Sequence, residues 1–122
     1  MRTTLSIGKC LVMCICLTSL AAAQDSAPAE PRPASELQTL LALNGLGYEY
    51  LRAGETETAI AVFALNVEAY PDEYNPHDSL GEALAAAGQT EEAIKSYARS
   101  LALNPGNRNA VVQLDKLTRS EP

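Results

Sequence analysis

The sequence has 122 residues, of which 47% are hydrophobic and 20% are charged, and this ordinary globular mixture argues against wholesale disorder. Nine basic residues against fifteen acidic ones leave a net charge of −6, which argues against nucleic acid as a partner because such binding relies on Lys and Arg. With one Phe, five Tyr and no Trp, the chain lacks the side chains for a large aromatic cofactor pocket, and no cofactor is expected.

The first 23 residues differ from the rest of the chain. Arg2 and Lys9 supply positive charge, residues 10–20 are apolar, and three alanines at 21–23 precede Gln24. This order is typical of a secretory signal peptide cleaved after Ala23, and it predicts a periplasmic or secreted protein. A retained membrane anchor is the alternative, but a span needs about 20 apolar residues in a row and Lys9 interrupts this run.

Cleavage at this site would remove every cysteine, because Cys10, Cys14 and Cys16 all precede it. The mature chain would then enter an oxidising compartment without mispairing, and it would hold neither a cysteine-ligated zinc ion nor a Cys nucleophile. Seven basic residues would remain against fifteen acidic ones, a net charge of −8. We therefore expect no membrane contact once the signal is removed.

Residues 24–34 are predicted to form a disordered linker, since they include three prolines and no large apolar residue. A helical domain is expected over residues 35–122. Ser35 and Gln38 have the spacing of a capping box, which predicts that the first helix starts with Ser35 as its cap.

The chain then repeats itself at an interval of 34 residues, the length of a helix–turn–helix unit. Repeat 1 is expected over about 40–73 and repeat 2 over about 74–107, with a capping helix at 108–119. The five predicted helices cover about 35–53, 56–70, 76–87, 90–103 and 108–119. Seven positions recur in one register: Leu46, Gly47, Gly54, Ala59, Ile60, Phe63 and Pro71 return as Leu80, Gly81, Gly88, Ala93, Ile94, Tyr97 and Pro105.

Each recurring position has a physical role in such a unit. Gly47 lies inside a helix, where it costs roughly 1 kcal/mol against Ala, so we expect the return helix to cross closely there through Ala59. Gly81 and Ala93 repeat this arrangement. The glycines at 54 and 88 suit the left-handed residue that ends a helix.

Three further residues are expected to cap the helices that follow the turns. Thr56 and Thr90 are the predicted caps of the two return helices, because each follows a turn glycine. Asn75 is the predicted cap of the third helix, with Pro76 in its first turn.

The residues Leu46-Gly47-x-x-Tyr50-x-x-x-Gly54-x-x-x-x-Ala59-Ile60-x-x-Phe63, closed by Pro71, resemble a tetratricopeptide repeat. The equivalent residues from Leu80 to Pro105 resemble a second one, with Leu84 where Tyr is usual. Asn66 and Ser100 stand where the motif has Ala. The resemblance implies an all-α fold, a short right-handed solenoid of antiparallel helix pairs sealed by the last helix.

No residue pattern predicts an enzyme. His77, Asp78 and Ser79 are consecutive on a helix, so their side chains point around it and cannot form a triad. Glu91 and Glu92 stand in the first turn of a helix, where acids favour the positive end of the dipole. The sequence contains no phosphate loop and no metal-binding motif.

The resemblance implies instead a concave groove lined by the first helix of each unit. The residues that it places there are Leu41, Asn44, Tyr48, Leu51 and Arg52 from repeat 1, Asp78, Ser79, Glu82 and Ala85 from repeat 2, and Val112, Gln113 and Lys116 from the capping helix. Relatives that grip acidic peptide tails use Lys, Arg and Asn, whereas Asp78 and Glu82 are acidic. We therefore expect a protein or peptide partner that carries Lys or Arg, anchored by an apolar residue near Tyr48.

Leu37, Leu40 and Leu41 are predicted to be exposed at the start of the first helix, and self-association or docking on a larger protein would cover them. Two functions from different classes follow. The first is an exported, non-catalytic adaptor that binds a protein or peptide. The second is a stabilising module that acts with a separate enzyme, since the stretch from Leu65 to Glu82 resembles the short repeat tail of some secreted serine hydrolases. An enzyme of unrecognised type is a third, weaker alternative.

Overall fold

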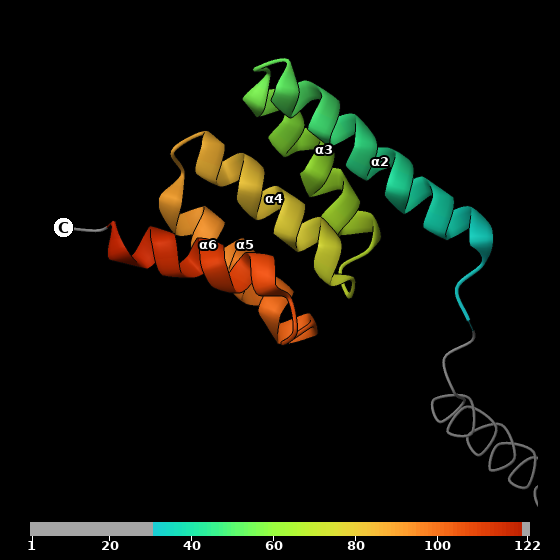
Figure 1. The fold of residues 1–122 in the computed structure, drawn as a ribbon. Helices are drawn as coiled ribbons and strands as arrows, with labels where there is room; N and C mark the ends of the chain where they lie inside the picture. The colour runs from blue at the N-terminus through green and yellow to red at the C-terminus, as the bar shows by residue number, and fades with distance from the viewer. Residues whose placement is uncertain (1–30, 121–122) are drawn as a thin grey trace, which may run out of the picture. The chain divides into compact units, whose positions relative to one another are not determined.

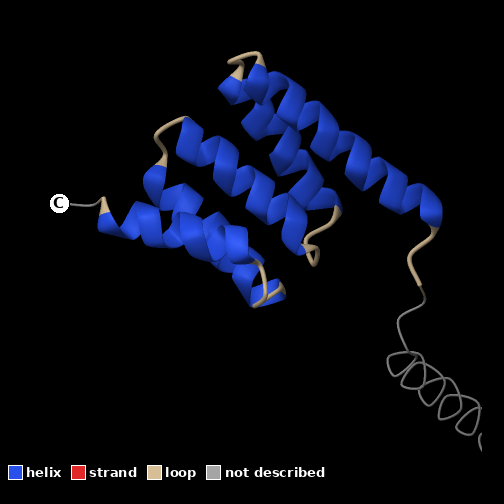
Figure 2. Ribbon diagram, in the orientation of Figure 1, coloured by secondary structure: helices blue, strands red, loops and turns tan. Residues whose placement is uncertain are grey.

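A computed structural model describes residues 31–120, so the predicted signal peptide and most of the predicted linker lie outside the described residues. The helical unit begins at Pro33. Within the described range the chain forms five helices and no strand (Figures 1 and 2). Their bounds are α2 Ala34–Arg52, α3 Thr56–Ala69, α4 Tyr74–Ala86, α5 Thr90–Leu103 and α6 Arg108–Arg119. The predicted helices agree with these bounds to within two residues.

The helices stack as two antiparallel pairs followed by a single helix. α2 packs on α3, and α4 packs on α5. Contacts between α3 and α4 join the two pairs, and α6 packs on α5. Short turns connect all of them (Figure 2). The all-helical solenoid predicted from the repeat is therefore confirmed.

Glycine ends the first helix of each pair in the same way. Gly54 and Gly88 have φ values of 80° and 76°, in the left-handed region that glycine adopts without a Cβ penalty. The amide of Gly54 donates to Leu51 O at 3.2 Å, and the next amide, that of Glu55, donates to Tyr50 O at 2.9 Å. This pair of bonds is a Schellman motif, and it satisfies carbonyls that the helix end leaves open.

The predicted helix caps are wrong in four places. Ser35, Thr56 and Thr90 lie inside the first turns of α2, α3 and α5, and Asn75 lies inside the first turn of α4. The residues at the cap positions are Pro33, Glu55, Glu73 and Gln89, none of which makes a side-chain cap bond. The Schellman motif explains why Thr56 and Thr90 are not the caps. Glu55 and Gln89 close this motif, and each of them is also the cap residue of the next helix.

α6 differs because its start is capped by a side chain. Asn107 Oδ1 accepts hydrogen bonds from the amides of Asn109 at 3.1 Å and Ala110 at 3.4 Å. These bonds satisfy two donors that a helix N-terminus leaves open, so the start of the last helix is fixed without help from a following unit.

An aromatic ring packs directly over a helix glycine in each pair. A Cβ atom on Gly47 would collide with the ring of Phe63, and a Cβ on Gly81 would lie 3.1 Å from the ring of Tyr97. Both rings are almost fully buried, at 0% and 1% exposure. The close approach predicted for these glycines is therefore present, but the group nearest to each glycine is the aromatic ring and not Ala59 or Ala93.

The two pairs share one continuous apolar interior. One cluster of buried residues surrounds Phe63 and another surrounds Tyr97, and Ile60 and Leu80 pack against both. Because these two side chains come from α3 and α4, they join repeat 1 to repeat 2. Tyr48 adds an edge-to-face ring contact with Phe63, with the centroids 5.2 Å apart.

The prediction that Leu40 is exposed is wrong, because only 4% of this residue is accessible, whereas Leu37 and Leu41 are half exposed. Asn66 on α3 bonds to the backbone of this buried residue. Its side chain is fully buried, and its Nδ2 donates to Leu40 O at 3.3 Å, which holds this part of α2 against α3. Within residues 31–120 the Asn66 Oδ1 atom has no hydrogen-bond partner.

We predict opposite effects for two alanine substitutions in α2. Gly47→Ala should lower the free energy of unfolding by about 2 kcal/mol, because the new methyl group displaces the Phe63 ring. Gly45→Ala should raise it by up to about 1 kcal/mol, because no atom lies within 4 Å and Ala favours the helix. Denaturant titrations followed by circular dichroism measure both, and equal stability of the two variants would contradict the packing described here.

Candidate peptide-binding groove

The predicted groove residues from α2 and α4 meet in a chain of hydrogen bonds. Ser79 Oγ donates to Asn44 Oδ1 at 2.7 Å, and the Tyr48 hydroxyl donates to Glu82 Oε2 at 2.8 Å. The Tyr48 hydroxyl also lies 3.3 Å from Ser79 Oγ. A carboxylate acceptor makes the Tyr48–Glu82 bond the strongest of the three, so these bonds fix the first helix of repeat 1 against that of repeat 2.

A second set of bonds joins α4 to the start of α6. Asp78 accepts at both carboxylate oxygens, from Asn107 Nδ2 at 3.0 Å and from Asn109 Nδ2 at 2.9 Å. Asn107 Nδ2 also donates to Ser100 Oγ at 2.9 Å. The two asparagines were missed in the sequence, although Asn109 occupies the place of Asn75 one repeat later, which was a usable signal.

The remaining predicted groove residues are less closely connected. Leu51 packs against the cluster around Phe63, and Arg52 Nε donates to Tyr48 O on its own helix at 3.1 Å. Leu41 is 54% exposed. Gln113 and Lys116 lie on α6, where Gln113 is half-buried and Lys116 is exposed. Ala85 is half-buried and packs against the Tyr97 cluster, whereas Val112 is 50% exposed.

The groove holds two acids one helical turn apart on its central helix. Asp78 and Glu82 accept hydrogen bonds from neutral amide and hydroxyl donors, so these bonds orient the carboxylates without cancelling their charge. Two nearby tyrosines have raised pKa values, for which burial is the largest cause and the charge of these acids a further one. Burial, a hydrogen bond to Glu82 and the charges of both acids raise the pKa of Tyr48 to about 12. Burial and the same two charges also raise the pKa of Tyr97.

His77 has a structural position at the start of α4. Its ring is 9% exposed, and Nε2 lies 2.9 Å from Pro71 O, which can only accept a hydrogen bond. Nε2 therefore carries a proton and ties α4 to the turn after α3. Within residues 31–120 no group of three His, Cys, Asp or Glu side chains is placed to hold a metal ion.

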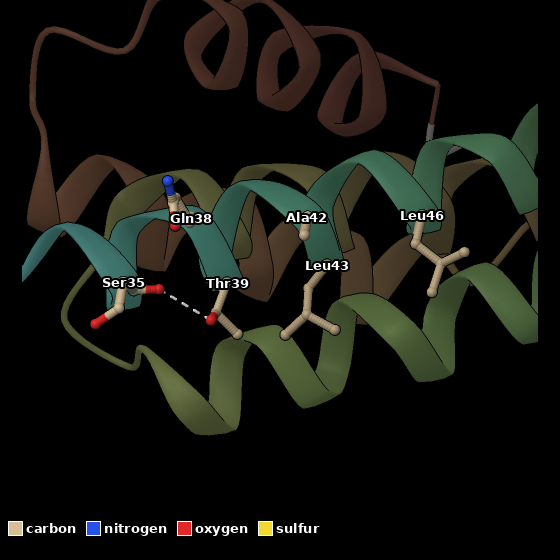
Figure 3. A pocket seen from close by; sticks show the side chains of 6 residues that line it. All are labelled: Ser35, Gln38, Thr39, Ala42, Leu43 and Leu46. Atoms are coloured by element: carbon tan, nitrogen blue, oxygen red, sulfur yellow. Dashed lines mark hydrogen bonds between the residues drawn. The ribbon is translucent and has the colours of Figure 1, made fainter.

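A hollow of about 530 Å³ lies elsewhere on α2, and Figure 3 shows the side chains that line it. It was not predicted, and it shares no residue with the predicted groove. Its residues, which we call the α2 end face, are Ser35, Gln38, Thr39, Ala42, Leu43 and Leu46.

The fold is that of a helical-repeat protein in which polar side chains of the predicted groove join α2, α4 and α6. Residues 75–107 match the family model of the tetratricopeptide repeat, which covers repeat 2. The predicted resemblance to the tetratricopeptide repeat is therefore confirmed over these residues, which include the glycine and alanine of repeat 2. Among the described residues, no helix has the length and apolar character needed to cross a membrane.

Known proteins with similar repeats support this assignment. A structure of a MamA mutant is 25% identical, with a TM-score of 0.59, and the match covers 66% of this chain and 59% of MamA. A tetratricopeptide repeat domain protein from Salinibacter ruber is 23% identical, with a TM-score of 0.54, over 66% of this chain and 92% of that one, and it shows the fold alone.

A curated relative is similar over a shorter stretch. Superkiller complex protein 3 of Homo sapiens is 37% identical over 59 residues, which is 48% of this chain and 4% of that protein. The chain therefore spans only a small fraction of this relative's length. Tetratricopeptide repeats build scaffolds for protein interactions and are generally non-catalytic, so the fold supports an interaction role.

We predict that Tyr48→Phe lowers the free energy of unfolding by about 1 kcal/mol at neutral pH, since it removes a part-buried hydroxyl that bonds Glu82. The pKa of Tyr48 is raised from 10.0 to about 12 by folding. The unfolded chain therefore loses this proton first, and the associated stabilisation is complete below about pH 10 and lost towards about pH 12.

The substitution should accordingly make the alkaline loss of stability shallower. Denaturant titrations from about pH 9 to about pH 12 measure this slope. Tyr74→Phe, on an exposed side chain, is the control and should leave both stability and slope unchanged. An unchanged slope in Tyr48→Phe would show that the hydroxyl ionises as freely in the folded chain as in the unfolded one.

Proposed function

We propose that this chain is an exported, non-catalytic scaffold that binds a protein or peptide segment carrying Lys or Arg in the groove of α2, α4 and α6. The observation that carries this proposal is the pair Asp78 and Glu82. Both carboxylates are held in place by neutral donors from neighbouring helices, and these bonds bring no cation to them. A cation that enters the groove therefore meets acceptors that are already oriented, which lowers the entropy cost of binding.

The two sides of the groove favour an extended ligand with mixed side chains. Leu41 is half exposed towards the start of α2 and offers an apolar contact beyond Tyr48. Arg52 and Lys116 stand at other positions of the groove, on α2 and α6. A ligand with a basic residue over α4 and an apolar residue near Leu41 satisfies this pattern, whereas a wholly acidic tail would meet Asp78 and Glu82.

We predict that the double variant Asp78→Asn, Glu82→Gln weakens the binding of a Lys- and Arg-containing peptide at least tenfold. The amides keep the size of the acids while removing both charges, and the salt dependence of binding should also become weaker. Fluorescence anisotropy with a panel of labelled basic peptides containing one Leu measures the effect.

The matched control changes the same charge elsewhere. Glu91→Gln, Glu92→Gln alters two exposed acids at the start of α5 and should leave affinity unchanged. Equal weakening in both double variants would show that only net charge matters. Equal binding of acidic and basic peptides would reject the proposed ligand class.

Export is part of this proposal and is supported by the sequence of residues 1–23. We predict that the chain recovered from the periplasm or medium of an expressing cell begins at Gln24, because small residues at 21 and 23 form the cleavage signal. Mass spectrometry of the purified chain identifies its first residue. Ala21→Arg, Ala23→Arg should block processing, and recovery of an unprocessed wild-type chain from the cytosol would contradict export.

A second candidate function is an accessory module for a separate enzyme. The stretch from Leu65 to Glu82, which resembles the repeat tail of some secreted serine hydrolases, is what favours it. In that case the exported chain would co-purify with a hydrolase and alter its stability. A stable complex of this kind that survives the groove substitutions would favour the accessory role over peptide binding.

A further inference from the structure

The α2 end face is a neutral, partly apolar surface on an acidic chain. Its six residues follow one another at spacings of three and one, so they lie along a single side of α2 (Figure 3). None of them carries a charge, although the whole chain has a net charge of −6. Leu46 lies two residues beyond Asn44, about 200° further round the helix, so this face points away from α4.

Repeat 2 shows what normally covers this side of the first helix. Pro76, Leu80 and Ala83 of α4 stand 34 residues after Ala42, Leu46 and Glu49 of α2. Pro76 and Ala83 are fully buried, and Leu80 packs into the cluster that contains Phe63 of α3. On α2 the equivalent residues Ala42 and Glu49 are exposed and Leu46 is 41% exposed. The α2 end face is therefore a helix-packing surface that residues 31–120 cover only in part.

The outer side of α3 supports the same conclusion. Leu65 is 57% exposed, while the equivalent position on α5 holds Arg99, which pairs with Asp72. Ala61 is likewise replaced by Lys95 one repeat later. The side chains of Leu43 and Leu46 point from α2 towards α3 (Figure 3). Repeat 1 thus presents apolar side chains where repeat 2 presents charged ones, as expected for a repeat that contacts another surface.

Two kinds of occupant fit this face poorly. A preceding tetratricopeptide repeat from another protein would bury Glu49 at the place where Ala83 is buried, and an unpaired buried carboxylate is costly. The C-terminal end of another copy offers the wrong surface. There the position of Gly47 and Gly81 is taken by Asp115, which forms an exposed ion pair with Arg119 at 2.9 Å.

We propose that the α2 end face is where two copies of this chain associate, with α2 of one copy antiparallel to α2 of the other. The contact is a symmetric one, in which each copy supplies the same neutral patch, so the net negative charge of both copies stays away from the interface. The antiparallel arrangement brings Glu49 of each copy towards the first turn of the partner helix. That turn also holds Glu36, so the positive dipole end of the helix and a like charge act on the Glu49 carboxylate in opposite directions, and the neutral patch supplies the attraction.

This proposal does not rest on the peptide groove, because the two surfaces share no residue. Its test uses the full chain, purified in the N-terminal form that the expressing cell produces. Sedimentation equilibrium should give twice the mass of one chain at high concentration. Ala42→Glu adds a charge at the centre of the face and should weaken association at least tenfold, a change of about 1.4 kcal/mol.

Two controls separate a specific loss of contact from unfolding. Ala98→Glu makes the same change at an exposed helix position on α5 and should leave association intact. Circular dichroism melting should show that both variants stay folded, since both alanines are exposed. Should Ala42→Glu fail to fold, Gln38→Glu carries the same charge to the same face.

Three results would overturn the proposal. The first is a wild-type chain that keeps the mass of one copy at all concentrations, which includes any case where another protein or the chain's own N-terminal residues cover the face. The second is a dimer that Ala42→Glu leaves intact. The third is equal weakening by Ala42→Glu and Ala98→Glu, which would assign the effect to net charge alone.

Discussion

The spacing of the helices depends on a ring packed against a glycine at the middle of each pair. The Phe63 ring lies closer to Gly47 than a Cβ would allow, and the Tyr97 ring lies so close to Gly81 that a Cβ there would be a tight contact. Glycine costs the helix roughly 1 kcal/mol, while full burial of a ring of this size contributes about 2–3 kcal/mol, so the contact is favourable overall. Small residues at Ala59 and Ala93, both completely buried, keep the rest of the crossing equally close.

This spacing also determines the groove. Once the pairs are set, the first helices of successive units lie near enough for polar side chains about one repeat apart to bond directly. Tyr48 reaches Glu82 at an interval of 34 residues, and Ser79 reaches Asn44 at 35. The groups that hold the solenoid in register are therefore among those predicted to line its groove. Because hydrogen bonds from neighbouring helices already orient the carboxylates of Asp78 and Glu82, a ligand does not need to order them.

The repeat interval made most of the fold predictable, because the same local signals occur in both units. Helix bounds and the turn glycines follow from such signals alone. The helix caps were not predictable in this way, since the Schellman turn fixes where α3 and α5 begin. The bond from Asn66 to the Leu40 carbonyl was not predictable either, since Asn66 is a departure from the motif on another helix. Within the groove, residue types identified Tyr48, Asp78 and Glu82, but the partners of Asp78 depend on how α6 docks.

α2 contributes to two surfaces that lie on opposite sides of one helix. Asn44 and Tyr48 face α4, whereas Ala42 and Leu46 belong to the α2 end face. Tyr48 follows Leu46 by two positions, and in an α-helix this interval turns the side-chain direction by about 200°. A ligand in the groove and a second copy on the end face would therefore not compete for the same side chains. Both would bind to the same helix, which is held against its neighbours by the contacts of Gly47, Asn66 and Tyr48. Substitutions that loosen α2 from α3 should consequently disturb both surfaces together, and a change at Glu82 also reaches α2 through its bond to Tyr48.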